Sequence, residues 1–377
     1  MSRRLFTVSI VSVFLMLAIF GVSVAQAGAS WVSFPSNPVL SANLTGWDSG
    51  GVFGPRVYYD GSIYRMWYTG TARILWGYRI GYAISKDGVY WGRPIADPVL
   101  QPGPPGSWDQ DFVSSPAIIY NGSAYLMWYV GGKRPSEYRY FTYSGSQGFG
   151  FATSTDGINW TKYNNGSAVM TPSTVDTSVM YDPWVLHVGN QFKMWYTCGS
   201  IESYLELCYA SSPDGIHWTK NPTPIFKGTG SASDWDADDV FAPNVLYDGH
   251  TYGMWYSGNL YSSQTVAKTQ IGYATSSDGI TWTRAAGNPI LGPSVLANWD
   301  SGDVDESGIL QAVGSFRLYY SAIASAHTNG PYAIGFAYPP AGFVLPELPS
   351  PTIIATVTLM LSTILLLVRK RRRLPHD

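Results

Sequence analysis

The chain has 377 residues, of which 45% are hydrophobic, 15% aromatic and only 13% charged. This composition supplies enough apolar surface for a large core and excludes a disordered chain, while 40 Gly and 25 Pro argue against a mainly helical one. The net charge is −2, and the basic residues gather at the two ends, so the middle of the chain is acidic. We therefore expect no nucleic-acid partner, because phosphate binding needs a basic surface.

The first 27 residues have the order of a secretory signal peptide. Two arginines precede an apolar run from Leu5 to Val24, and a stretch of small residues ends at Ala27. A basic, an apolar and a small-residue region in that order predict export, with cleavage after Ala27. An uncleaved membrane anchor is the alternative.

Residues 31–340 contain five copies of one repeat. Each copy has a Met-Trp-Tyr triplet or a variant of it, and its Tyr lies 20 residues after an Asp that usually follows Trp. The five tyrosines and their aspartates are Tyr68 and Asp48, Tyr129 and Asp109, Tyr196 and Asp176, Tyr256 and Asp236, and Tyr320 and Asp300. Self-similarity at a period of about 60 residues predicts an array of one supersecondary unit.

Each repeat is predicted to form four antiparallel strands. In the first repeat, strands Val52–Tyr59 and Ile63–Thr69 flank an Asp-Gly turn, and the third strand, Ile80–Ser85, leads through a second Asp-Gly turn into a fourth. Asp-Gly between alternating apolar runs is a strong hairpin signal. The turn into the fourth strand recurs as Ser-x-Asp-Gly-x-x-Trp, which ends at Trp91, Trp160, Trp218 and Trp282.

The two cysteines, Cys198 and Cys208, both lie in the third repeat. They occupy neighbouring strands, at positions where the other repeats have glycine at one or both sites. We expect a disulfide across this hairpin in an exported protein, with two free thiols as the alternative. No His accompanies them, and no phosphate-binding loop, dinucleotide fingerprint or His-rich metal spacing is found, so we expect no cofactor and no metal.

The two ends of the repeat array are complementary. The fifth repeat stops after its third strand, Ile334–Tyr338, and the stretch Trp31–Leu40 before the first repeat has the spacing of a fourth strand. The N-terminal strand is thus expected to complete the last sheet, which leaves no open edge. Four-stranded repeats closed into a ring describe an all-β, five-bladed β-propeller over residues 31–340.

The chain after the repeats has three parts. Residues 341–351 form a Pro-rich linker, residues 352–368 are apolar, and residues 369–377 are basic. The apolar part has the length of a short transmembrane helix, and the basic cluster predicts a cytoplasmic C-terminus. We therefore expect a single-pass protein whose monomeric propeller lies on the extracellular face of the cell membrane.

Repetition separates scaffold residues from residues that break the symmetry. The start of each first strand is expected to face the propeller axis, and the repeats align there at one position, which we call the slot: Gly54, Ser115, Asp182, Ala242 and Glu306. The acids at or beside the slot that break the symmetry are candidates for catalysis: Asp182, Asp305 and Glu306. The candidates for substrate binding are Arg56, Tyr181, Trp184, Phe241, Asn244 and, on a variable loop, Trp76.

Asp182 and Glu306 come from repeats three and five, which face one another across a ring of five. Glycoside hydrolysis needs two such carboxyl groups, one protonated as the acid and one ionised as the base or nucleophile. Arg56 is placed to lower one pKa or to bind a substrate carboxylate. The alternative is a structural polar plug satisfied by water molecules.

The blade count, the Ser-x-Asp-Gly-x-x-Trp motif and Asp182-Pro183 resemble the five-bladed propeller glycosidases: the arabinanases and β-xylosidases, the invertases and levansucrases, and the mannoside phosphorylases. The resemblance covers nearly all of residues 31–340 and implies action on glycosidic bonds of poly- or oligosaccharides. Those families place Asp, Asp and Glu at the axis in blades one, two and three, where this chain has Gly54, Ser115 and Asp182. Either the acids come from other blades, or the propeller is a glycan-binding or adhesion module that does not cleave its ligand.

Overall fold

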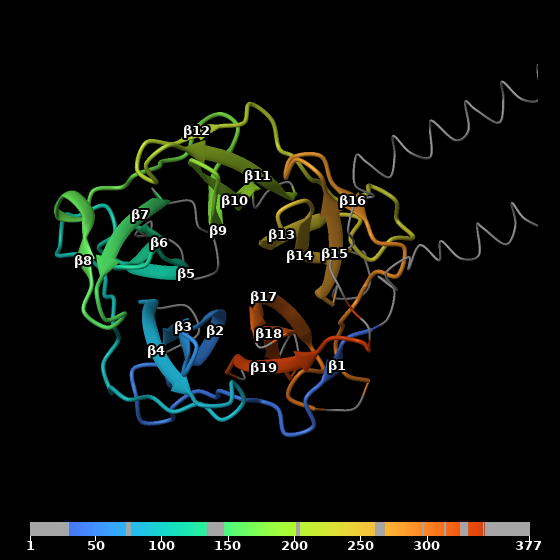
Figure 1. Ribbon diagram of the computed structural model, residues 1–377, viewed down its shortest axis with the longest axis horizontal. Helices are drawn as coiled ribbons and strands as arrows, with labels where there is room; N and C mark the ends of the chain where they lie inside the picture. Colours follow the sequence, from blue (N-terminus) through green and yellow to red (C-terminus); the bar gives the residue numbers. More distant parts are fainter. Residues whose placement is uncertain are drawn as a thin grey trace, which may run out of the picture.

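The computed structural model describes residues 30–72, 77–133, 147–200, 204–260, 268–295, 298–312, 314–324, 331–341 and 343. Within them, five antiparallel sheets surround one central axis, so the predicted all-β, five-bladed propeller is confirmed (Figure 1). The predicted signal peptide and the predicted membrane helix, residues 352–368, lie outside the described residues. The ranges that are described contain no helix with the length and hydrophobicity of a membrane span.

The blades follow one another along the chain. Blade one contains β2 (Gly51–Tyr59), β3 (Tyr64–Thr71) and β4 (Arg79–Ser85). Blade two contains β5 (Phe112–Tyr120), β6 (Tyr125–Gly132), β7 (Gln147–Ser154) and β8 (Thr161–Lys162), and a short 3₁₀ turn, Tyr163–Gly166, follows it. Blade three contains β9 (Val179–Val188), β10 (Gln191–Gly199), β11 (Leu205–Ser212) and β12 (Thr219–Lys220). Blade four contains β13 (Asp239–Tyr247), β14 (Tyr252–Asn259), β15 (Gln270–Ser276) and β16 (Thr283–Arg284). Blade five contains β17 (Asp303–Ala312), β18 (Ser315–Ile323), β19 (Ala333–Tyr338) and, from the other end of the chain, β1 (Val32–Ser33).

The ring closes through the N-terminal strand. Val32 pairs with Tyr338 and Ser33 with Ala337, and a further bridge joins Leu40 to Ile334. The predicted completion of the last blade is therefore present. Because the first and last segments share one sheet, opening the ring requires breaking main-chain hydrogen bonds.

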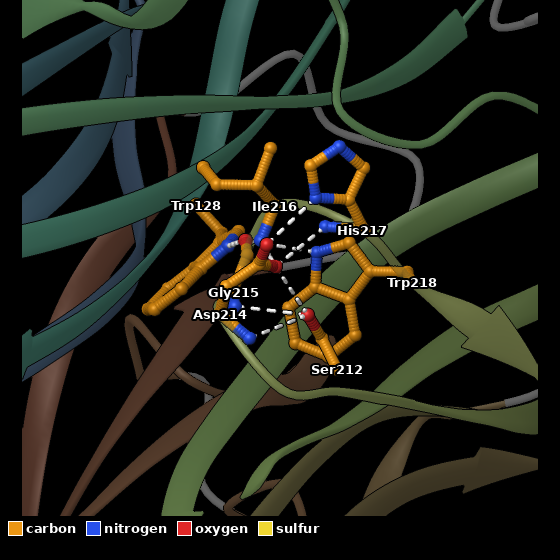
Figure 2. A network of polar contacts seen from close by, with 7 residues as sticks. All are labelled: Trp128, Ser212, Asp214, Gly215, Ile216, His217 and Trp218. Carbon is orange, nitrogen blue, oxygen red and sulfur yellow. Dashed lines mark hydrogen bonds and ion pairs between the residues drawn. The ribbon is translucent and has the colours of Figure 1, made fainter.

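At four of the five blade junctions, the turn between the third and fourth strands of one blade is bonded to the neighbouring blade. Figure 2 shows this turn in blade three, where Asp214 accepts the backbone N–H groups of Ile216 and His217. From blade two, Trp128 donates its indole N–H to the carbonyl oxygen of Gly215 at 2.7 Å. The same bond to the turn glycine is made from three other blades: Trp67 to Gly157, Trp195 to Gly279 and Tyr319 to Gly88. The repeated Met-Trp-Tyr triplet thus joins neighbouring blades.

The junction of blades four and five lacks this bond. The fourth strand of blade five is β1, which enters from the N-terminus rather than from a turn after β19. The indole N–H of Trp255 has no hydrogen-bond partner among the described residues. The ring of Trp31 packs edge-on against Trp255 with centroids 6.3 Å apart, as its equivalents Trp160 and Trp218 pack against Trp67 and Trp128. In addition, the ring of Phe343 lies 6.2 Å from Trp255. The contact with Phe343 is therefore what this junction has in place of the hydrogen bond.

The aspartates of the repeat form buried polar triads. In blade one, Asp48 accepts a hydrogen bond from Tyr68 at 3.0 Å and forms an ion pair with Arg93 at 2.8 Å. Equivalent cations pair with the aspartates of the next three blades: Lys162, Lys220 and Arg284. In blade five the cation position is Ser33, whose hydroxyl contacts Tyr320. Burial accordingly raises the pKa of Asp300.

The two cysteines are joined in a disulfide, as the sequence predicts. In blade one, a Cβ on Gly70 would lie 2.7 Å from the ring of Trp47, so the tryptophan fills the space above the glycine. In blade three the tryptophan position is Val175, and Cys198 takes the place of the glycine. The buried disulfide thus occupies the part of the blade that a tryptophan fills in its neighbours.

Candidate functional site

The slot residues lie on the innermost strands of the five blades, which surround the axis in Figure 1. All five adopt left-handed backbone conformations: φ is 60° at Gly54, 45° at Ser115, 46° at Asp182, 49° at Ala242 and 40° at Glu306. A register shift accompanies the slot in the four blades whose pairing is resolved there, which is the signature of a β-bulge. Left-handed conformations cost a non-glycine residue about 1 kcal/mol or more. The fold therefore stores backbone strain at the slot, where the β-bulge changes the direction of the side chains.

Hydroxyl groups hold the slot backbone across the blade junctions. A Ser or Thr on the second strand of one blade accepts the slot N–H of the next: Ser321 from Gly54, Thr69 from Ser115, Thr197 from Ala242 and Ser257 from Glu306, at 2.9 to 3.1 Å. The equivalent residue at the junction of blades two and three is Val130. The junction of blades two and three, on which Asp182 lies, is thus the one that has no hydroxyl group at this position.

Asp182 is buried, with 7% of its surface exposed. Its Oδ1 accepts a hydrogen bond from the Ser115 hydroxyl at 2.9 Å, and its Oδ2 accepts one from Thr197 at 3.3 Å. Burial raises the pKa of Asp182, while the charge of Arg56 and the two hydroxyl donors oppose that rise. Blade two therefore helps to position the acid of blade three.

Glu306 is partly buried and lies beside Gly54 of the next blade. A Cβ on Gly54 would lie 3.3 Å from Glu306 Oε2, so the missing side chain makes room for this carboxyl group. Burial, with the charge of Asp182, raises the pKa of Glu306 to about 8, although Arg56 and the Ser321 hydroxyl act against it. Within the part of the chain that the structure describes, Oε2 has no hydrogen-bond partner. The adjacent Asp305 is 9% exposed, and burial together with Glu306 raises its pKa well above the usual range.

Arg56 meets Trp184 at the axis. The guanidinium carbon of Arg56 lies 5.1 Å from the centroid of the Trp184 ring. Arg56 belongs to blade one and Trp184 to blade three, which are not adjacent in the ring, so these two side chains reach across the hub. Arg56 donates to the carbonyl oxygens of Pro55 and Ser307 at 3.0 Å. Burial lowers its pKa to about 10, while Asp182 and Glu306 favour its charged form. Trp184 in turn donates to the carbonyl oxygen of Val245 at 2.6 Å.

Solvent reaches the predicted binding residues to different degrees. Arg56 exposes 3% of its surface and Asn244 none, so both are buried at the hub. Tyr181 and Phe241, one residue before the slot, are partly exposed. Tyr181 accepts a hydrogen bond from Gln147 at 3.2 Å. Trp76 lies outside the described residues.

The hub brings together the three acids, Arg56 and Trp184 that the sequence singles out. Among the residues that the structure places, no group of three or more His, Cys, Asp or Glu is arranged to hold a metal. Sequence reasoning missed the hydroxyl groups that bind Asp182 and the slot backbone. A signal was present, because Ser or Thr directly follows the aromatic triplet in four of the five repeats.

Comparison with known proteins gives the following results. No family model matches the chain. An uncharacterised protein of Mycobacterium tuberculosis is 28% identical over 240 residues, which cover 62% of this chain and 75% of that protein. A glycosyl hydrolase from Bacteroides ovatus has a TM-score of 0.61 at 18% identity, covering 83% of this chain and 93% of its own. A member of the GH130 mannoside phosphorylase family, described with hydrolases that target β-1,2 mannosidic linkages in Candida mannan, has a TM-score of 0.61 at 16% identity, covering 84% and 98%. The GH32 β-fructofuranosidase of Bombyx mori has a TM-score of 0.56 at 15% identity, covering 81% and 62%.

The chain has the fold of the propeller glycosidases. The likeness extends over nearly all of the five blades, in agreement with the resemblance read from the sequence. The acids at its axis nonetheless come from blades three and five. The blade-one position that is Asp in the resembled families is Gly54, and the space beside it holds the Glu306 carboxyl group.

Proposed function

We propose that the protein is a glycoside hydrolase that uses Asp182 and Glu306 as its pair of carboxyl groups on poly- or oligosaccharides. One observation carries the proposal: two acids from different blades occupy the same slot at the hub and interact electrostatically with each other and with Arg56. Two carboxyl groups with separate environments are the working parts of glycosidic bond hydrolysis. The likeness to glycosidase propellers supports the same chemistry.

The site is compatible with sugar binding. Partly exposed aromatic rings, Tyr181 and Phe241, directly precede the slot, and aromatic rings pack well on the apolar faces of sugars. The predicted signal peptide and the apolar C-terminal stretch support a location on the extracellular face of the cell membrane. The substrate is then a glycan met outside the cell.

The test is turnover of a panel of aryl-glycosides and polysaccharides by the wild type, Asp182→Asn and Glu306→Gln. Each substitution is expected to lower kcat by at least about a hundredfold, the range typical of losing an acid or base. Asp300→Asn is the matched control, because it also neutralises a buried carboxyl group but lies in the polar triad of blade five. Equal turnover by wild type and Asp182→Asn removes Asp182 from the mechanism.

A second function, glycan binding without cleavage, is favoured by the burial of Asp182 and by Ser115 at a position where the resembled families have Asp. A pure binding module predicts no turnover of any substrate, together with glycan affinity that survives Glu306→Gln. Calorimetric titration of oligosaccharides that show no turnover separates the two functions.

A further inference from the structure

The two acids of the hub receive hydrogen bonds of different kinds. Each oxygen of Asp182 accepts from a side-chain hydroxyl, one from Ser115 on β5 and one from Thr197 on β10. Beside Glu306, the Ser321 hydroxyl and the backbone N–H of Gly54 favour the ionised form, but Oε2 has no hydrogen-bond partner among the residues that the structure places. Hydroxyl donors stabilise a carboxylate more than a neutral carboxyl group, because a bond to a charged acceptor is stronger. The hydrogen bonds thus favour the ionised form at Asp182.

The blade junctions hold the two hydroxyl groups beside Asp182. Thr197 Oγ1 accepts the backbone N–H of Ala242 at 2.9 Å and donates its single proton to Asp182. The backbone of Ser115 is held by its own N–H bond to Thr69 at 2.9 Å, and its hydroxyl donates to the other oxygen of Asp182. Each hydroxyl has one proton, and in these contacts both protons go to Asp182.

Four charged or titratable groups face Asp182 from the packed elements. Arg56 on β2 favours a negative Asp182, while Glu306 and Asp305 on β17 and the neighbouring Tyr181 on β9 oppose it when they ionise. One cation faces several acids, so charge alone does not separate the roles of Asp182 and Glu306. The asymmetry that remains is that both oxygens of Asp182 accept a bond from a hydroxyl, whereas Glu306 has the single hydroxyl of Ser321 and an Oε2 that accepts no bond from any described residue.

We propose that Ser115 and Thr197 are positioning residues that keep Asp182 ionised, so that Asp182 is the base or nucleophile and Glu306 is the acid. The assignment rests on the proposed hydrolase function. It gives a role to Ser115, a residue from a neighbouring blade that is not itself an acid.

The first test is the pH profile of kcat/KM on whichever substrate the panel identifies. In Ser115→Ala the low-pH limb, which reports the base, is expected to move up by about one pH unit, since losing one bond to a charged group costs about that much. The high-pH limb stays in place. Ser321→Ala is the control, because Ser321 lowers the pKa of Glu306 and its loss is expected to move the high-pH limb instead. A uniform loss of kcat in Ser115→Ala with both limbs unmoved overturns the proposal.

The second test does not need turnover. A double-mutant cycle of Ser115→Ala and Asp182→Asn is measured by urea unfolding from pH 4 to pH 9. Asn keeps the shape and one acceptor oxygen, so the cycle isolates the charge on Asp182. The coupling is expected to grow with pH to about one pKa unit, which equals about 1.4 kcal/mol. A coupling that does not change with pH overturns the proposal. If the coupling grows with pH but no substrate is turned over, the ionised state of Asp182 is supported and the hydrolase function is rejected.

Discussion

The burial of Glu306 at the hub can be tested by measuring the stability of the protein, because a neutral residue at this position removes a charge that the folded state disfavours. Burial raises the pKa of Glu306 from 4.5 to about 8, so the folded state holds the proton more tightly than the unfolded chain. A group of this kind stabilises the fold fully below its unfolded pKa, and that stability is lost as pH rises through the folded value. Glu306→Gln cannot ionise and does not suffer this loss. The free energy of unfolding of the variant should therefore increase relative to that of the wild type between about pH 4.5 and pH 8.

The size of the effect follows from the shift. A rise of about 3.5 pKa units corresponds to about 5 kcal/mol above both values, and we expect about 3 to 5 kcal/mol because Glu306 is partly exposed. At pH 5 the same relation leaves about 1 kcal/mol. Any fixed cost of placing an amide beside Gly54 adds equally at every pH, so the slope with pH is the quantity to compare.

Urea unfolding followed by tryptophan fluorescence from about pH 2.5 to pH 9 measures this slope and covers the range in which the control below titrates. Asp60→Asn is a control of opposite sign, because backbone N–H groups of Ile63 and Ser62 lower the pKa of Asp60 to about 2. That substitution should cost stability at neutral pH and cost less as the pH falls toward 2. A Glu306→Gln difference that stays constant or shrinks with rising pH would refute the burial argument for the hub.

Two further predictions concern exchanges between blades. Ser33→Lys supplies the cation that blade five lacks beside Asp300. We expect the free energy of unfolding to rise by about 1 kcal/mol at pH 7, and to rise further with pH as Asp300 ionises. Unfolding at pH 5 and pH 8 checks this, and a stability equal to or below that of the wild type at both would contradict it. The double variant Cys198→Gly, Cys208→Gly should lose about 2 to 3 kcal/mol of stability, the usual contribution of a short disulfide loop. Adding Val175→Trp should recover part of the loss, because the tryptophan would fill the space that the disulfide leaves. Thermal unfolding of the double and triple variants measures both effects, and no recovery would show that tryptophan and disulfide do not fill the same space.

The scaffold was readable from sequence because it is repeated. Asp-Gly turns and aromatic triplets recur at nearly constant spacing. Each is a local pattern, and its recurrence in the other repeats supports the interpretation made in the first. The closure between Trp31–Leu40 and the last strand followed from the same spacing, and so did the pairing of Cys198 with Cys208. The symmetry-breaking acids Asp182 and Glu306 stood out against this regular background.

The hydrogen bonds of the hub could not be read in the same way. Ser115 and Asp182 are 67 residues apart, and Thr69 and Ser115 are 46 apart, so only the ring geometry brings them within reach. Likewise, a repeat pattern records that Val175 replaces a tryptophan but not that a disulfide fills the space.

The sequence by itself determined the number of blades, their order and how the ring closes, because these depend on local turns and on spacing along one chain. The tertiary structure alone decided which acid is bound by hydroxyl groups and how deeply each acid is buried. Those properties depend on neighbouring blades that meet at the axis, where small shifts in position change the local dielectric and the hydrogen bonds of each carboxyl group.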